Sequence, residues 1–155
     1  GDAMRVADST RPLSPYHLYR GIVNRRLNIF GSATGLSCLA SMSDADIKAR
    51  IQATAGDNVW GLSRFGLTSD EYFKEIVRTR SRGYGIRLAT YVGETVLDDR
   101  LSAIALPVFR SDKVFGAVSL LFPRGFESTE SFAEKYLNDL AKAAKQFSVD
   151  LDQFA

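Results

Sequence analysis

The chain has little of the two residue types on which disulfides and many metal sites depend, with one cysteine and one histidine among 155 residues. The lone Cys38 cannot close an intrachain disulfide, which is typical of a protein from a reducing cytoplasm. Zinc sites are usually built from several histidine and cysteine ligands, so no bound metal is expected. We predict a cytoplasmic protein without a cofactor.

Charge of one sign and long apolar runs are also scarce. The 20 Lys and Arg residues stand against 18 Asp and Glu residues, for a net charge of +2. This balance argues against a dedicated nucleic-acid binder, because such proteins gain affinity by neutralising phosphates. No segment approaches the roughly 18 apolar residues of a membrane helix. With 45% hydrophobic residues, the chain is predicted to form one soluble globular domain over residues 1–155.

Hydrophobic periodicity, capping residues and turn residues divide the chain into elements. Ser43 and Thr68 are typical helix N-caps, and a short polar turn at residues 110–113 joins the two strands of the clearest hairpin. The predicted strands cover residues 4–9, 13–23, 101–109 and 114–122, and the predicted helices cover about 31–41, 43–56, 68–83 and 131–153. One apolar stripe of the last helix holds Phe132, Tyr136, Leu140, Ala144, Phe147 and Leu151.

Small side chains are concentrated where a helix and the hairpin are expected to meet. Residues 31–41 are almost all small, which lets a helix lie close to a sheet. Ala103 and Ala105 share a face of the first hairpin strand, and Ser119 and Leu121 share a face of its partner. Because cores pack densely, small groups on both sides predict a void that a ligand fills. We expect a concave apolar pocket that opens toward the helix start, whose free N–H groups favour a carboxylate.

Other motifs are weighed against plainer interpretations. Gly83 and Gly85 lack the third glycine of a dinucleotide fingerprint. Cys38 lies about two turns into its helix, so a small buried hydrophobe is favoured over a nucleophile paired with His17. A solvated turn is favoured over a carboxylate pair at residues 98 and 99. A solvated helix end is favoured over a grip on an acidic ligand or DNA for Arg78, Arg80, Arg82 and Arg87.

Tyr16, His17 and Tyr19 place two aromatic rings and an imidazole on one predicted strand. Ordinary alternation between core and surface explains them as well as a binding wall does.

Three stretches resemble the effector domain of IclR-type transcriptional regulators. Residues 27–40 (LNIFGSATGLSCLA) resemble the entry to its small-residue helix, and residues 76–84 (IVRTRSRGY) resemble its helix end before an R-G-[YW] turn. Residues 101–109 (LSAIALPVF) and 114–121 (VFGAVSLL) resemble its closing hairpin. The resemblance implies an α+β, GAF-like fold, with an antiparallel sheet flanked by helices. It also implies a bacterial ligand sensor rather than an enzyme.

The same resemblance implies a partner for each part of the regulator. DNA would be bound only by an N-terminal winged helix-turn-helix domain that is absent from this chain, and the start Gly1-Asp2-Ala3 is typical of a cut edge. A homodimer or homotetramer is expected, with Trp60 and Phe65 as exposed apolar contacts. The effector is expected between the sheet and the small-residue helix, with its carboxylate on backbone amides near Ala33 and Thr34.

The expected ligand-binding residues are Tyr16, His17, Tyr19, Ala33, Thr34, Ala103, Ala105, Ser119 and Leu121. Ala103 stands where many members have cysteine, Leu121 stands where they have serine, and residues 87–99 form a longer segment than usual. These departures argue against an effector as small as glyoxylate. Residues 10–16 (TRPLSPY) look like regulators of aromatic-acid catabolism such as the hydroxyphenylpropionate activators.

We therefore hypothesise an aromatic carboxylate that stacks near Tyr16 or Tyr19 and bonds to Ser119 or His17. Two alternatives stay open. The first is a stand-alone GAF-like sensor or interaction domain, which a sequence of the parent gene would distinguish. The second is a small hydrolase that uses Cys38.

Overall fold

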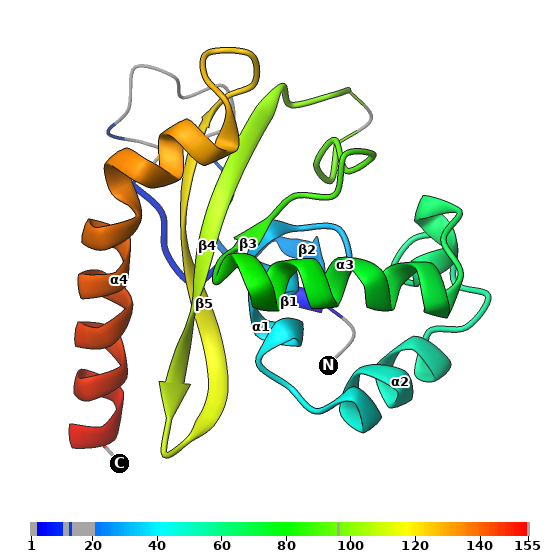
Figure 1. Ribbon diagram of the computed structural model, residues 1–155, viewed down its shortest axis with the longest axis horizontal. Coiled ribbons are helices and arrows are strands. Elements are labelled where there is room, and N and C mark those ends of the chain that lie inside the picture. The colour runs from blue at the N-terminus through cyan, green and yellow to red at the C-terminus, as the bar shows by residue number, and fades with distance from the viewer. Residues whose placement is uncertain (1–2, 11–12, 14–20, 96, 155) are drawn as a thin grey trace.

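The computed structural model describes residues 3–10, 13, 21–95 and 97–154. Its strands are all paired antiparallel, as a two-stranded sheet β1–β2 and a three-stranded sheet in the order β3–β4–β5. The elements in chain order are β1 (Ala3–Arg5), β2 (Arg26–Asn28), α1 (Ala33–Ala40), α2 (Asp44–Ala53), a 3₁₀ helix (Leu62–Phe65), α3 (Ser69–Arg82), β3 (Gly85–Ile86), β4 (Leu101–Arg110), β5 (Lys113–Pro123) and α4 (Thr129–Gln153). This arrangement confirms the predicted α+β class (Figure 1).

The β4–β5 hairpin forms where the sequence predicts it. Ser111 and Asp112, between the strands, have φ angles of 46° and 61°, as a turn that matches the right-handed twist of a hairpin requires. The Ser111 N–H also donates to a carboxylate oxygen of Asp152 at 2.9 Å, which ties the turn to the end of α4. The register pairs Ala103 with Leu121 and Ala105 with Ser119, so these side chains lie on one face of the sheet.

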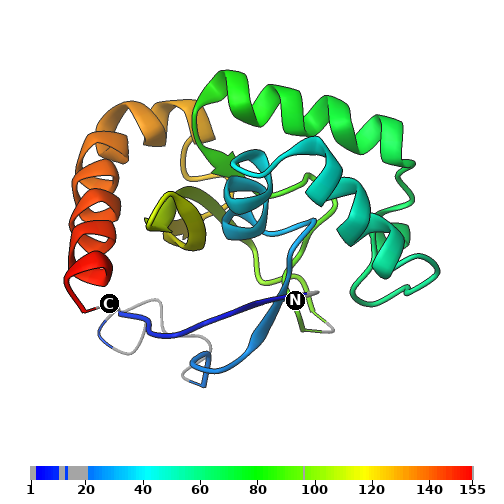
Figure 2. The ribbon, with the colours of Figure 1, turned by 90° about the horizontal axis from the view of Figure 1, so that it is seen from below.

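The two faces of the hairpin are covered by different helices, α4 on one side and α1 on the other (Figure 2). Ile104 and Phe122 pack against Phe132 and Leu140 of α4, and the rings of Phe122 and Phe132 stack at 3.9 Å. Opposite them, α1 lies very close to β3. A Cβ atom on Gly85 would overlap the carbonyl oxygen of Ala33, so only glycine permits this approach.

A second core joins α1 to the helices beyond it. Its buried side chains include Phe30, Leu39, Ile47, Tyr72 and Ile76. The Tyr72 hydroxyl donates to the Phe30 carbonyl at 2.9 Å, so this buried hydroxyl has a partner. The helix ends agree with the predicted caps, because Ser43 and Thr68 both accept N–H groups of the first turn.

The arginines near the end of α3 point in different directions, as predicted, but they are not simply solvated. Arg80 donates to the carbonyl oxygens of Ala40 and Met42 and pairs with Asp44 at 2.8 Å. Arg82 pairs with Glu75 at 3.2 Å. The prediction of a solvated helix end is therefore wrong for Arg82, which is half-buried against α3, whereas Arg80 remains exposed while it links α3 to the connection between α1 and α2.

Some predicted boundaries and faces are also wrong. The first strand ends at Arg5 instead of residue 9, although Val6 still exchanges two backbone hydrogen bonds with Asn24 and Arg25. On α4, Tyr136 and Phe147 are 43% and 52% exposed because the narrow sheet covers only the stripe of Phe132, Leu140 and Ala144. The predicted strand over 13–23 falls mostly outside the described residues, and Asn24, just after it, turns the chain with a φ angle of 66°.

Trp60 and Phe65, which the sequence predicts as exposed contacts, are half-buried. The Arg26 guanidinium lies 4.0 Å from the centroid of the Trp60 ring, and Phe65 lies against Tyr91 with ring centroids 6.3 Å apart. Among the helices of the described residues, none is long and apolar enough to cross a membrane.

Candidate functional site

The start of α1 is set by two side-chain caps. The Asn28 Oδ1 atom accepts the N–H groups of Phe30 and Gly31 at 2.8 and 3.1 Å, and the Ser32 hydroxyl accepts the N–H of Gly35 at 3.1 Å. Within the described residues, no acceptor is found for the N–H groups of Ala33 and Thr34. These two amides at the positive end of the helix are therefore available to an anion.

Beneath α1, the predicted small residues of the site come together. Ala33, Ala103 and Ala105 form a buried cluster with exposures of 3%, 5% and 0%. The close approach of the helix thus fills the space above β4 with protein. On the same face, Ser119 is half-buried and Leu121 is 39% exposed, so the accessible part of this face lies over β5.

The remaining predicted ligand-binding residues differ in what the structure says of them. Thr34 is partly exposed in the first turn of α1. Tyr16, His17 and Tyr19 lie outside the described residues. A ligand pocket between the sheet and α1 therefore stays a prediction. The structure describes its expected floor on β4 and β5 and the start of α1, but its expected aromatic residues lie outside the described part of the chain.

The segment between β3 and β4 crosses the end of the sheet near the start of α1. Its Leu88 N–H donates to the Gly31 carbonyl at 3.0 Å, and a Cβ atom on Gly31 would overlap the rings of Phe65 and Tyr91. The Tyr91 ring is 2% exposed, and this burial raises the pKa of its hydroxyl. Position 31 therefore has no room for a side chain, because the rings of Phe65 and Tyr91 occupy that space. The sequence alone indicates only that a small residue stands here.

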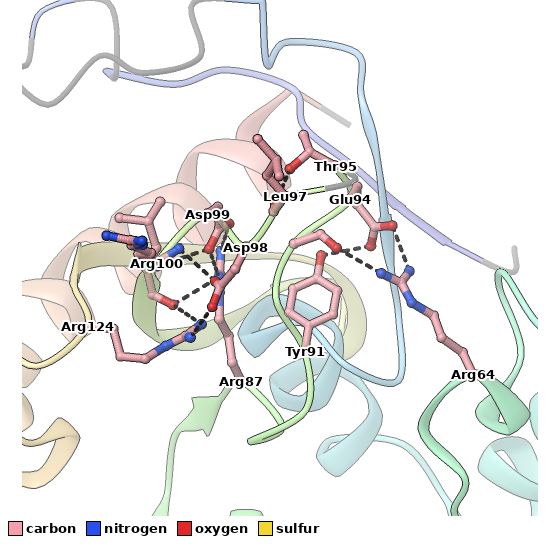
Figure 3. A network of polar contacts seen from close by, with 12 residues as sticks. Arg64, Arg87, Tyr91, Glu94, Thr95, Leu97, Asp98, Asp99, Arg100 and Arg124 are labelled. Carbon is pink, nitrogen blue, oxygen red and sulfur yellow. Dashed lines mark hydrogen bonds and ion pairs between the residues drawn. The ribbon is translucent and has the colours of Figure 1, made fainter.

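Two ion pairs hold this segment, one on each side of the Tyr91 ring (Figure 3). Arg87 binds both carboxylate oxygens of Asp99, at 2.7 and 3.0 Å. Arg64 binds Glu94 at 2.7 Å, and Glu94 also accepts the Tyr91 hydroxyl at 2.8 Å and the Asn28 N–H at 2.7 Å. Glu94 therefore joins the segment to β2 and to the 3₁₀ helix.

The structure corrects the prediction of a solvated turn at the two neighbouring aspartates. Asp98 agrees with it, because it accepts the Arg100 N–H at 2.8 Å and pairs with Arg124 where both side chains are about 40% exposed. Asp99 does not, since its pair with Arg87 leaves the two side chains only 10% and 12% exposed. No local pattern predicts this pair, because twelve positions of irregular chain separate the partners.

Cys38 is a buried side chain of the packed core and is not poised as a nucleophile. It is 3% exposed, and its thiol donates to the Gly116 carbonyl at 3.2 Å. Desolvation raises its pKa to about 12, so the reactive thiolate is scarce at neutral pH. The predicted buried hydrophobe is confirmed, and the hydrolase alternative loses its nucleophile.

Two surface hollows lie away from the predicted site. A groove of about 830 Å³ runs between α2 and the hairpin turn, past Met42, Arg50 and Lys113. A smaller one of about 220 Å³ lies between the ends of α1 and α3, near Ala40, Arg80 and Pro107. Neither groove contains a predicted ligand-binding residue. In the smaller one, Arg80 already bonds to the Ala40 carbonyl and to Asp44.

Comparisons with known proteins give the same fold. A transcriptional regulator from Rhodococcus sp. RHA1 has a TM-score of 0.67 at 19% identity, covering 86% of this chain and 51% of that one. The C-terminal domain of the Escherichia coli regulator KdgR has a TM-score of 0.63 at 20% identity, covering 84% and 74%. The IclR protein of Thermotoga maritima has a TM-score of 0.61 at 17% identity, covering 84% and 49%. This chain therefore spans about half the length of two of these proteins.

At these identities, the solved structures establish the GAF-like fold. The family described as bacterial transcriptional regulator IclR C-terminal matches residues 18–149. The family and the solved structures are transcriptional regulators and not enzymes, which confirms the prediction of a domain without catalysis. The chain therefore belongs to the family of C-terminal domains of bacterial IclR-type transcriptional regulators.

Proposed function

We propose that this domain binds an aromatic carboxylic acid on the α1 side of the β4–β5 hairpin. The observation that carries the proposal is the pair of N–H groups of Ala33 and Thr34, which lie beside a small-residue face and find no acceptor among the residues that the structure describes. A carboxylate would complete the hydrogen bonding of these amides and interact favourably with the helix dipole.

The sheet offers the rest of the acid a suitable surface. Leu121 is 39% exposed and gives apolar contact, while the half-buried Ser119 gives a hydroxyl group two positions away on the same face of β5. Apolar walls with a few placed polar groups are the common composition of small-molecule sites. Tyr16, His17 and Tyr19 remain our proposal for the aromatic side of the site.

The proposal extends to the whole regulator. A winged helix-turn-helix domain before this chain would bind DNA, and the acid would change that binding in the cytoplasm of a bacterium that degrades aromatic compounds. A homodimer would present two such DNA-binding domains, and a homotetramer four, to a symmetric operator.

Calorimetric titration tests the site directly. We expect at least one aromatic acid among 3-phenylpropionate, its hydroxylated derivatives and benzoate to bind the wild-type domain, with pyruvate as the non-aromatic comparison. Ser119→Leu should abolish that binding by filling the face next to α1. Ser102→Leu is the matched control, because Ser102 is also half-buried but lies one position from Ala103, on the α4 side of the sheet.

Two results would contradict the proposal. One is that no aromatic acid of the panel binds the wild-type domain. The other is that an acid binds but the two serine variants affect its affinity equally, which would place the ligand elsewhere. Thermal melting of both variants checks that neither has lost its fold.

A further inference from the structure

We draw no further inference here: the strongest candidate, the groove of about 830 Å³ between α2 and the turn of the β4–β5 hairpin, is lined by acidic, basic and apolar side chains together, and nothing in the structure shows what covers it.

Discussion

At the scale of the residue, glycine carries information that composition alone does not reveal. Gly35 is the third residue of α1, and an alanine inside a helix would ordinarily stabilise it by about 1 kcal/mol relative to glycine. A Cβ atom there would overlap the carbonyl oxygen of Ile29, which belongs to the backbone and cannot give way. The sequence predicts a close contact here from the run of small residues, but it does not say which atom is touched.

We therefore expect Gly35→Ala to destabilise the domain by about 2 kcal/mol or more, because a backbone overlap costs more than the gain in helix propensity. Gly116→Ala is the control, since no atom lies within 4 Å of its added Cβ, and it should change stability by less than about 0.5 kcal/mol. Urea denaturation of both variants measures the difference. A neutral or stabilising Gly35→Ala would show that α1 can move away from Ile29.

Cys38 gives a prediction for alkaline pH. Burial raises the pKa of its thiol from 9.0 to about 12 in the folded state, so the unfolded state loses this proton first. The stabilisation is complete below pH 9 and is lost as the pH rises from 9 towards 12, by about 1.4 kcal/mol per pH unit. The free energy of unfolding should therefore fall more steeply between pH 9 and 10.5 for the wild-type domain than for Cys38→Ala. Parallel curves would contradict this assignment.

At the scale of the element, the sequence predicts best where the signal is local. The caps of α2 and α3 and the β4–β5 turn depend on residues within a few positions of one another, and all are found as expected. Prediction was weaker for the face of α4, because burial of Tyr136 and Phe147 depends on how wide a sheet lies beneath them. The Arg87–Asp99 pair was missed because its partners meet only after the whole segment has folded.

The hairpin turn allows a test at a single position. Asp112 has a φ angle of 61°, which glycine adopts without strain and a β-branched residue resists. Asp112→Gly should raise the free energy of unfolding by about 0.5–1 kcal/mol, and Asp112→Val should lower it by about 1 kcal/mol or more. Thermal and urea melting of the two variants provide the comparison. Equal effects would argue against a left-handed conformation at this position.

At the scale of the whole molecule, a few polar contacts join β2, the 3₁₀ helix and the segment between β3 and β4. Glu94 is the most connected of these, because its carboxylate joins β2, the 3₁₀ helix and the segment before β4 through Asn28, Arg64 and Tyr91. Such a junction cannot be predicted from the sequence, in which the three partners are 66, 30 and 3 positions away. The GAF-like fold was nevertheless expected, because residues 27–40, 76–84, 101–109 and 114–121 resemble the effector domain of IclR-type regulators.

We expect Glu94→Gln to lower the free energy of unfolding by about 2–4 kcal/mol, because it leaves a partly buried arginine without its anion. Glu127→Gln is the matched control. It also removes one ion pair, with Lys135, but that lysine is 56% exposed and the loss should be below about 1 kcal/mol. Chemical denaturation measures the free energy of unfolding of both variants. Losses of equal size would contradict the claim that Glu94 stabilises the fold more than an exposed ion pair does.

The tight seam between α1 and the sheet also limits how the ligand preference of such a domain could change. Ala33, Ala103 and Ala105 are packed without room for larger side chains, so substitutions there would push α1 away before they reshaped a pocket. Ser119 and Leu121 on β5 retain accessible surface and can change size without disturbing the core. New effector specificities should therefore arise by substitution along β5. Ala103 and Ala105, which pack against α1, should not change, because larger side chains there would disrupt the packing of the helix on the sheet.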